Sequence, residues 1–170
     1  MAEYLGLKVS IPSNDTQHID YLQQQSKNGK LTMPVCNDCS LMHYPPSTMC
    51  PECHSTNLGW KPVSGKGTVH SYVVIPHAIN PAFKNTGFLP YPLVLIELDE
   101  QRGVPTEHRA LRMVANIVKD DGNPEVEENL AIGKRVEAKL IELGDGMALP
   151  QFKMSNEPPE HTPWQWPSNA

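Results

Sequence analysis

Four cysteines, arranged as two Cys-x-x-Cys pairs, constrain the fold of this chain more than any other feature. The first pair is Cys36 and Cys39, the second is Cys50 and Cys53, and ten residues separate the two pairs. Each Cys-x-x-Cys turn directs two sulfur atoms at one point, and two facing turns complete a tetrahedron of thiolates. The spacing therefore predicts one zinc ion held by all four cysteines. Because no coordination position stays open for water, we expect a structural rather than a catalytic metal.

Two other uses of cysteine fit the sequence less well. A thioredoxin-like redox site needs a single Cys-x-x-Cys at a strand–helix junction, and this chain has two such motifs. Disulfides suit a secreted chain, but residues 1–8 lack the charged start and apolar core of a signal peptide. Reduced cysteines without a signal peptide predict a cytoplasmic protein. His43 and His54 lie beside the cysteines, and we interpret both as polar neighbours rather than ligands.

Length and charge narrow the function classes. The 170 residues suit one medium domain or two small ones. A formal net charge of −5, with only 14 lysines and arginines, is the opposite of the basic surplus of most nucleic-acid-binding proteins. No stretch approaches the roughly 20 apolar residues of a membrane-spanning helix. We therefore expect neither a nucleic acid nor a membrane as the main partner.

Hydrophobic periodicity predicts a mainly β fold behind one leading helix. The helix is expected over residues 14–28, with Ile19 and Leu22 on one face and Gly29 as its stop. The polar run of residues 23–28 indicates little intramolecular burial, so this helix is expected to be a solvated arm or to pack on another protein. Period-two alternation then predicts five strands, over residues 68–75, 93–98, 111–117, 135–140 and 147–154.

A second, short helix is expected between the third and fourth strands. It opens at Asn123, places Val126 and Leu130 on one face at spacing i, i+4, and ends at Gly133. Five strands with a helix in this position follow the order of an OB barrel. The strand order leaves an open five-stranded sheet as the alternative.

These patterns divide the chain into four segments. They are an N-terminal helical arm (1–33), a zinc ribbon (34–60), an OB-fold domain (61–154) and an extended tail rich in Pro and Trp (155–170). Within the ribbon, Leu41, Met42 and Tyr44 are expected to cover the metal. Trp60 is expected to form the apolar seam between the ribbon and the next domain.

Two segments carry aromatic side chains that the predicted core does not use. The loop of residues 76–92 holds Phe83, Phe88 and Tyr91, and loops longer than about 12–15 residues are often functional. The tail holds Trp164 and Trp166 among prolines and cannot form a core of its own. Tryptophan in such a tail is typical of a docking surface. We predict that these five aromatic residues contact a protein partner.

Several motifs together resemble one known family. They are Gly29-Lys30-Leu31 after the leading helix, the cysteine pairs with Pro45-Pro46 between them, residues 63–69 (VSGKGTV), residues 92–99 (PLVLIELD), and residues 143–146 (LGDG) followed by Leu149-Pro150. Over about residues 18–154 the chain resembles the DUF35 proteins, which join a rubredoxin-like zinc ribbon to an OB fold and are associated with acyl-CoA chemistry. The connection of residues 99–109 and the tail after Met154 depart from the family pattern.

The resemblance implies an accessory role. Proteins similar to this one pair with thiolase-superfamily enzymes, as thiolases, aldolases or acyltransferases in aromatic or steroid degradation. The expected assembly is a heterotetramer of two copies of each subunit. In such a complex the partner carries the catalytic residues and binds most of the CoA ester, and this chain contributes the zinc-ribbon and OB subunit.

The residues themselves agree with a chain that lacks catalysis of its own. With all four cysteines committed to metal, no nucleophilic Cys remains, and neither a Gly-x-Ser-x-Gly elbow nor a phosphate-binding glycine loop is present. His70 and His77 are interpreted as structural histidines, and Glu97 and Asp99 as a surface carboxylate pair. The alternative function is a single-stranded nucleic-acid-binding OB protein, which needs a basic groove with stacking aromatics that this acidic chain offers poorly.

Overall fold

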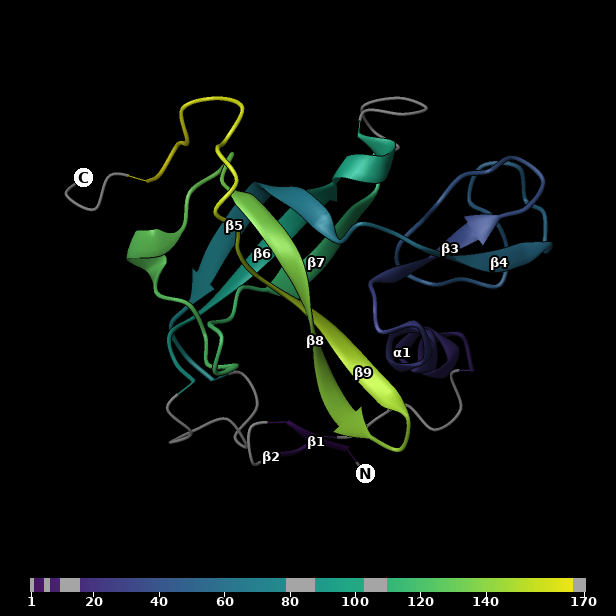
Figure 1. Cartoon of the computed structure of the whole chain (residues 1–170), viewed down its shortest axis with the longest axis horizontal. Coiled ribbons are helices and arrows are strands. Elements are labelled where there is room, and N and C mark those ends of the chain that lie inside the picture. Colours follow the sequence, from purple (N-terminus) through teal and green to yellow (C-terminus); the bar gives the residue numbers. More distant parts are fainter. Residues whose placement is uncertain (1, 5–6, 10–15, 79–87, 103–109, 167–170) are drawn as a thin grey trace.

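The computed structural model describes residues 2–4, 7–9, 16–78, 88–102 and 110–166. A two-stranded hairpin, β1 (Ala2–Tyr4) with β2 (Leu7–Val9), precedes helix α1 (Thr16–Asn28). Strands β3 (Thr32–Cys36) and β4 (Leu58–Pro62) form the base of the cysteine-containing ribbon. Figure 1 shows the ribbon and α1 side by side at one end of the molecule, with the larger sheet at the other.

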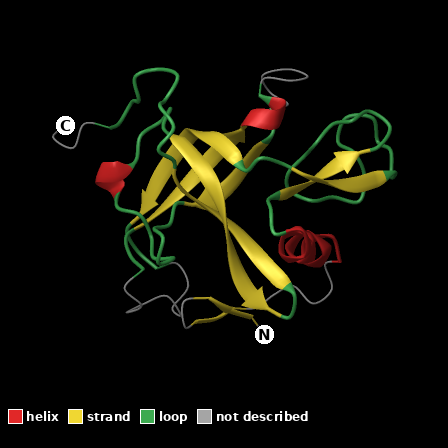
Figure 2. Cartoon of the chain, viewed as in Figure 1, coloured by secondary structure: helices red, strands yellow, loops and turns green. Residues whose placement is uncertain are grey.

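Five strands form the larger sheet in the order β7-β6-β5-β8-β9. They are β5 (Lys66–Ile75), β6 (Tyr91–Leu98), β7 (Arg112–Asn116), β8 (Arg135–Gly144) and β9 (Met147–Met154), and all neighbouring pairs are antiparallel (Figure 2). Single-turn 3-10 helices cover Asp99–Gln101 after β6 and Glu127–Asn129 before β8. The predicted mainly β fold with a leading helix, a ribbon and a five-stranded OB-like domain is confirmed.

The two outer strands of this sheet meet, which distinguishes an OB-like barrel from an open sheet. A parallel bridge joins Ile117, just after β7, to Phe152 of β9, and the Val118 N–H donates to the Phe152 carbonyl at 2.7 Å. The buried Gln151 side chain adds a second link, because its Oε1 accepts the Asn116 N–H at 2.9 Å. Parallel contact between the third and fifth strands is what closure of the predicted strand order requires.

Tight curvature of the barrel depends on Gly67 in β5. A Cβ atom at this position would lie 2.7 Å from the Glu97 carbonyl oxygen and 2.8 Å from Cγ2 of Ile96. Only glycine permits so close an approach of two strands. A register shift between Val69 and Ser71 then redirects the rest of β5 along β6.

One continuous apolar core joins the helix, the ribbon and the barrel. Buried Tyr21 of α1 and Met33 and Met42 of the ribbon belong to the same cluster as the barrel residues Ile96 and Phe152. Trp60 packs against this cluster, with its ring 6.2 Å from that of Tyr21. The ribbon is therefore fixed to both α1 and the barrel by a shared core.

The prediction that the leading helix has little intramolecular burial, as a solvated arm would, is wrong. Tyr21 and Gln25, spaced i, i+4, are buried, and α1 packs against β9 and β3 (Figure 1). The Gln25 amide donates to the Thr32 carbonyl at 2.8 Å and accepts the Thr32 N–H at 2.8 Å. Hydrogen bonding thus buries a residue that the sequence pattern assigns to solvent. Gly29 ends the helix with φ +59°, as predicted.

The prediction of a helix from Asn123 to Gly133 is also wrong. The segment contains only the 3-10 turn at Glu127–Asn129. Leu130 is fully buried, whereas Val126 is 44% exposed, so the two residues do not share a face. The i, i+4 spacing predicts a common face only for an α-helix, and the chain is extended on both sides of the turn.

No helix among the described residues is long and apolar enough to cross a membrane.

Candidate metal centre

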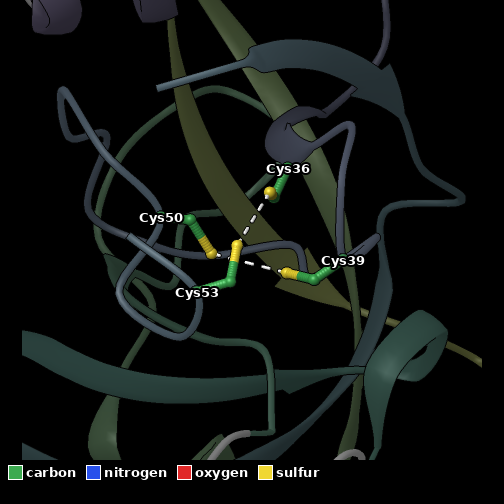
Figure 3. Close-up of side chains that lie close together, drawn as sticks. All are labelled: Cys36, Cys39, Cys50 and Cys53. Atoms are coloured by element: carbon green, nitrogen blue, oxygen red, sulfur yellow. Dashed lines mark hydrogen bonds between the residues drawn. The ribbon is translucent and has the colours of Figure 1, made fainter. Parts of the chain in front are cut away.

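The structure brings the four predicted ligands together. The Sγ atoms of Cys36, Cys39, Cys50 and Cys53 all lie within 4.8 Å of one another. Figure 3 shows the two pairs facing each other, with Cys36 Sγ 3.5 Å from Cys53 Sγ and Cys39 Sγ 3.5 Å from Cys50 Sγ. Zinc–sulfur bonds of about 2.3 Å in a tetrahedron give sulfur–sulfur separations of about 3.8 Å. The donor set and its spacing therefore fit a zinc ion.

The two Cys-x-x-Cys turns repeat the same backbone geometry. In the first, the Cys36 N–H donates to the Leu41 carbonyl at 2.9 Å and the Ser40 N–H donates to the Cys36 carbonyl at 2.9 Å. In the second, the Cys50 N–H donates to the Ser55 carbonyl at 2.8 Å and the His54 N–H donates to the Cys50 carbonyl at 3.0 Å. The repeat explains why two turns of unrelated sequence present their sulfurs in the same way.

Each turn ends on a residue with a left-handed backbone. Ser40 has φ 64° and His54 has φ 60°, and each directly follows the second cysteine of its pair. Such a conformation is unfavourable for residues other than glycine. The role of His54 is thus to continue the turn, and neither His54 nor His43 belongs to the cysteine cluster. The position after each Cys-x-x-Cys is the sequence signal that identifies these two residues.

Backbone amides lie close to the sulfur atoms of the first cysteine in each pair. The Glu52 N–H lies 3.4 Å from Cys50 Sγ. The Cys39 N–H is the largest influence that lowers the pKa of the Cys36 thiol, to about 7, from an ordinary value of 9.0. The pKa values of the Cys39 and Cys53 thiols are instead raised, by burial and by hydrogen bonds with the other cysteines, so four thiolates at this site need the charge of a bound metal.

A polar network ties the two turns together outside the metal. Asp38 accepts hydrogen bonds from the Ser55 hydroxyl at 2.5 Å and from the Asn57 amide at 2.9 Å. These bonds hold the pKa of Asp38 below its usual range. The Asn57 side chain in turn accepts from the Asn37 amide at 3.0 Å. The second turn is therefore linked to the first by side chains as well as by sulfur.

The predicted cover of the metal site is correct for one residue of three. Leu41 packs with Cys36 and Cys50 in a small apolar cluster. Met42 and Tyr44 instead pack into the shared core, where the Tyr44 ring lies 5.9 Å from that of Tyr21. Alternation along the chain explains the difference, because consecutive residues point to opposite sides of the ribbon.

The seam between ribbon and barrel is held by a second buried glutamine. Gln101 accepts the Met42 N–H at 2.9 Å and donates to the Met42 carbonyl at 2.8 Å. His43 lies beside this seam, is 7% exposed, and contacts the Ser47 hydroxyl through Nε2 at 3.0 Å. Burial lowers the pKa of His43. A small cavity of about 200 Å³ borders His43, Tyr44 and Arg112.

Of the five aromatic residues predicted to contact a partner, the structure pairs Trp164 with Trp166. Phe83 lies outside the described residues. Phe88 precedes β6, and Tyr91 is its first residue, half-buried. Trp164 and Trp166 form an edge-to-face pair with ring centroids 6.1 Å apart and are 51% and 63% exposed.

The tail that carries the tryptophans follows the barrel through residue 166. Trp164 and Ile132 exchange two backbone hydrogen bonds, of 2.8 and 2.9 Å, and the Trp166 N–H donates to the Tyr72 hydroxyl at 3.4 Å. None of residues 155–166 is buried, in line with the prediction that the tail forms no core. Backbone anchoring with exposed rings presents the tryptophan pair outward.

Charged side chains fix the first part of the tail. Arg135, only 8% exposed, donates to both Asp99 oxygens, at 2.8 and 2.5 Å, and to Glu157 of the tail at 3.2 Å. Arg135 is the main influence that lowers the pKa of Asp99. Arg102 joins Asp99 to Glu160 of the tail. These bonds connect two carboxylates of the tail to the barrel.

Of the remaining acid–base candidates, His70 and Glu97 border one cavity of about 230 Å³, together with Arg102. His70 and His77 are exposed and lie on different parts of β5 and its following turn. Glu97 pairs with Arg112 at 2.7 Å, and Asp99 pairs with Arg135, so the two carboxylates belong to separate ion pairs.

Comparison with known proteins identifies the same two modules. A family model described as the ChsH2 rubredoxin-like zinc ribbon domain matches residues 27–59, and one described as the ChsH2 C-terminal OB-fold domain matches residues 60–140. A "DUF35 domain-containing scaffold protein" from Methanothermobacter thermautotrophicus is 33% identical over 78 residues, which is 45% of this chain. The match spans 56% of that relative's length.

The comparison with solved structures gives two examples of similar chains. One is the "Ltp2-ChsH2(DUF35) aldolase", with a TM-score of 0.63 and 26% identity over 85% of this chain and 98% of the matched chain. The other is a DUF35-family protein of unknown function from Sulfolobus solfataricus, with a TM-score of 0.46 and 13% identity over 83% of this chain and 95% of that one.

Proposed function

Because this chain belongs to the DUF35 family, we propose that it is the non-catalytic zinc-ribbon and OB subunit of an enzyme complex. The observation that carries the proposal is the likeness to the Ltp2-ChsH2(DUF35) aldolase structure, which extends over 98% of the matched chain. The similarity also covers 85% of this chain. The scaffold description of the methanogen relative supports the same kind of role.

The proposed catalytic partner is a thiolase-superfamily subunit that acts on CoA esters. It supplies the catalytic residues and binds most of the CoA ester, and the reaction is carbon–carbon cleavage or acyl transfer. All four cysteines of this chain lie in the metal cluster, so none remains as the nucleophile of such a reaction. The proposed complex is a cytoplasmic heterotetramer with two copies of each subunit.

In this proposal the metal acts through structure. When bound, zinc supplies four bonds that fix both Cys-x-x-Cys turns. Residues of the chain connect the metal site to the helix and to the barrel. Strand β3 runs from Cys36 to Thr32, which hydrogen-bonds with Gln25 of α1, and Met42 hydrogen-bonds with Gln101 of the barrel. Loss of the metal is therefore expected to loosen the helix and the seam as well as the ribbon.

We include the tryptophan pair and the start of β6 in the proposed partner surface. Trp164 and Trp166 are held by backbone bonds, so little freedom is lost when a partner covers their rings. Replacing both by Ala leaves the backbone bonds to Ile132 in place and is expected to weaken the complex. Met49, 43% exposed on the ribbon, provides the matched control as Met49→Ala. If the double variant and the wild type bind the partner with equal affinity, the tail is not part of the proposed partner surface.

Co-expression with the thiolase-superfamily subunit from the same organism tests the proposed function. The expected result is a complex that stays intact through size-exclusion chromatography, with a mass of two plus two subunits by light scattering. Two separate species at micromolar concentration would contradict the proposal.

The nucleic-acid alternative gains no support from the outer side of β6 and β7. The outward side of the barrel strands carries Arg112, whose guanidinium is paired with Glu97. A single-strand-binding groove needs free cations between stacking aromatics.

A further inference from the structure

The tail lies over the barrel as a strap that is fixed at two places. We use that name for residues 155–166, which Figure 1 shows in yellow beside the end of the barrel where β8 begins. At the first place, the Ser155 N–H donates to the Arg135 carbonyl at 3.0 Å. At the second, Trp164 exchanges two backbone hydrogen bonds with Ile132. Between these places, ion pairs of side chains join the strap to the barrel.

The ion pairs of the strap involve two carboxylates and three cations of the barrel. Glu157 pairs with Lys66 through one oxygen and with Arg135, at 3.2 Å, through the other. Glu160 pairs with Arg102. The Lys66 and Glu160 side chains are 49% and 60% exposed, and ion pairs between exposed groups contribute little to stability. An anion that binds the same cations can therefore displace the strap.

The barrel surface under the strap carries an excess of positive charge. Apart from the strap, the carboxylate that meets these three cations is Asp99, which accepts hydrogen bonds from Arg102 at 2.5 Å and from Arg135 at 2.8 and 2.5 Å. Three cations with one carboxylate leave two positive charges in excess, although the whole chain has a net charge of −5. The two carboxylates of the strap supply the two negative charges that balance them.

Two cavities lie between the strap and the barrel, and each contains part of this charge. The first, of about 230 Å³, is bordered by Arg102 of the barrel and by Glu160 of the strap. The second, of about 350 Å³, is bordered by Lys134 and Arg135 of the barrel and by Glu157 of the strap. Both far exceed the about 10–15 Å³ that one water molecule requires. The surface beside these cations therefore has room for a small molecule.

Other charges around the two cavities leave the excess unchanged. Glu97 borders the first cavity and is paired with Arg112 at 2.7 Å. The second cavity adds one cation, Lys134, and one carboxylate, Glu125. A ligand that replaces the strap at this surface must therefore bring about two negative charges.

The geometry of the cations favours phosphate as the source of that charge. Arg135 is only 8% exposed, and Asp99 and the Thr68 hydroxyl, which accepts from Arg135 at 2.8 Å, hold its guanidinium in place. Guanidinium groups donate paired hydrogen bonds to phosphate oxygens, and a fixed guanidinium needs no rearrangement to do so.

We propose that the barrel surface under the strap is a binding site for a small phosphate-bearing anion of at least two negative charges, such as a diphosphate. Glu157 and Glu160 occupy the cations of this site in the structure. The strap thus competes with the ligand and leaves the cations when the ligand binds. This inference does not depend on the catalytic subunit of the proposed function.

The test measures binding of inorganic pyrophosphate to the full zinc-loaded chain by calorimetry at fixed ionic strength. Glu157→Gln combined with Glu160→Gln is expected to bind pyrophosphate about tenfold more tightly than the wild type, because a larger fraction of the variant has an open site. Glu142→Gln with Asp145→Asn removes two exposed carboxylates at the far end of the β8–β9 hairpin and is expected to bind as the wild type does.

A second measurement follows the strap itself. A glutamate-specific protease cleaves after Glu157 and Glu160, and saturating pyrophosphate is expected to accelerate both cleavages of the wild type at least about threefold, because the open fraction of the strap rises. Sodium chloride of the same ionic strength serves as the control. Equal acceleration by the salt shows that charge screening alone opens the strap, and overturns the proposed site.

Removal of the exposed cations tests the site directly. Lys66→Gln with Arg102→Gln is expected to weaken pyrophosphate binding at least about tenfold, as loss of two charge-assisted contacts does. Circular dichroism, and zinc content before and after each titration, verify that every variant stays folded. Unchanged affinity of this variant, or affinity of the Glu157→Gln and Glu160→Gln variant no tighter than that of the wild type, overturns the proposal. Tighter binding of succinate or of an oligo-dT than of pyrophosphate overturns the proposed ligand.

Discussion

Gln25 offers the sharpest test of how helix α1 is held. Its side chain is fully buried and makes three hydrogen bonds: it donates to the carbonyls of Tyr21 and Thr32, at 3.0 and 2.8 Å, and accepts the Thr32 N–H at 2.8 Å. Thr32 is itself fully buried. Gln25→Ala thus leaves the N–H and C=O of Thr32 unsatisfied beside a new cavity.

The magnitude follows from these two effects. A buried backbone group without a partner is unfavourable by about 1–3 kcal/mol, and truncation to Ala adds about 1 kcal/mol for the cavity. Two such groups, the N–H and the C=O of Thr32, lose their partner, so we expect Gln25→Ala to lower the free energy of unfolding by about 3–7 kcal/mol. The assay is urea unfolding of the zinc-loaded chain followed by circular dichroism, together with amide exchange at Thr32.

Two further variants separate hydrogen bonding from helix propensity. Gln23→Ala, an exposed position of the same helix, is expected to change stability by less than about 0.5 kcal/mol. Gln25→Glu keeps the acceptor for Thr32 but turns an oxygen toward two carbonyls, which favours the protonated acid. The pKa of the introduced carboxyl group is then raised in the folded state. The free energy of unfolding of this variant therefore falls further below that of the wild type as the pH rises above about 4.3. If Gln25→Ala unfolds within 0.5 kcal/mol of Gln23→Ala, the reasoning is refuted.

Three other predictions concern the ribbon. Cys39→Ser is expected to reduce bound zinc from one ion per chain to near zero by plasma emission analysis, and full zinc content in the variant would contradict the four-thiolate site. His54→Gly relieves the left-handed backbone at φ 60° and is expected to stabilise the ribbon by about 0.5–1 kcal/mol in thermal unfolding, whereas His54→Ala gives no gain. Burial lowers the pKa of His43 in the folded state below the value of about 6.5 expected for the unfolded chain. The stabilisation that neutral His43 contributes is therefore complete above about pH 6.5 and is lost as the pH falls from there toward the folded-state pKa. His43→Gln should therefore show a shallower loss of melting temperature between pH 7.5 and 5.5 than the wild type, and equal slopes would show that His43 does not titrate in this way.

The elements that the sequence predicts well are those with a strong local pattern. Two Cys-x-x-Cys pairs specify the ribbon because each sulfur pair needs its own turn, and Gly29 specifies the end of α1 because φ is positive there. The period-two alternation of apolar residues predicts the five barrel strands, since successive side chains on a strand point to opposite faces.

The elements that it predicts poorly depend on contacts distant in sequence. Gln23, Gln24 and Gln25 are chemically identical, and only Gln25 faces the backbone of Thr32. Val126 and Leu130 have helical spacing, yet the chain around them is extended. The exposure of Val73 and Val114 is not predicted either, because alternation assigns apolar residues of a strand to the core.

Turnover of a CoA ester by separated and combined subunits tests the central claim most directly. The account predicts no carbon–carbon cleavage or acyl transfer by this chain alone, and activity of its thiolase-superfamily partner that rises when the zinc-loaded chain is added at equal concentration. Turnover by the purified chain in the absence of its partner, or full activity of the partner that does not change on addition of the chain, would contradict it.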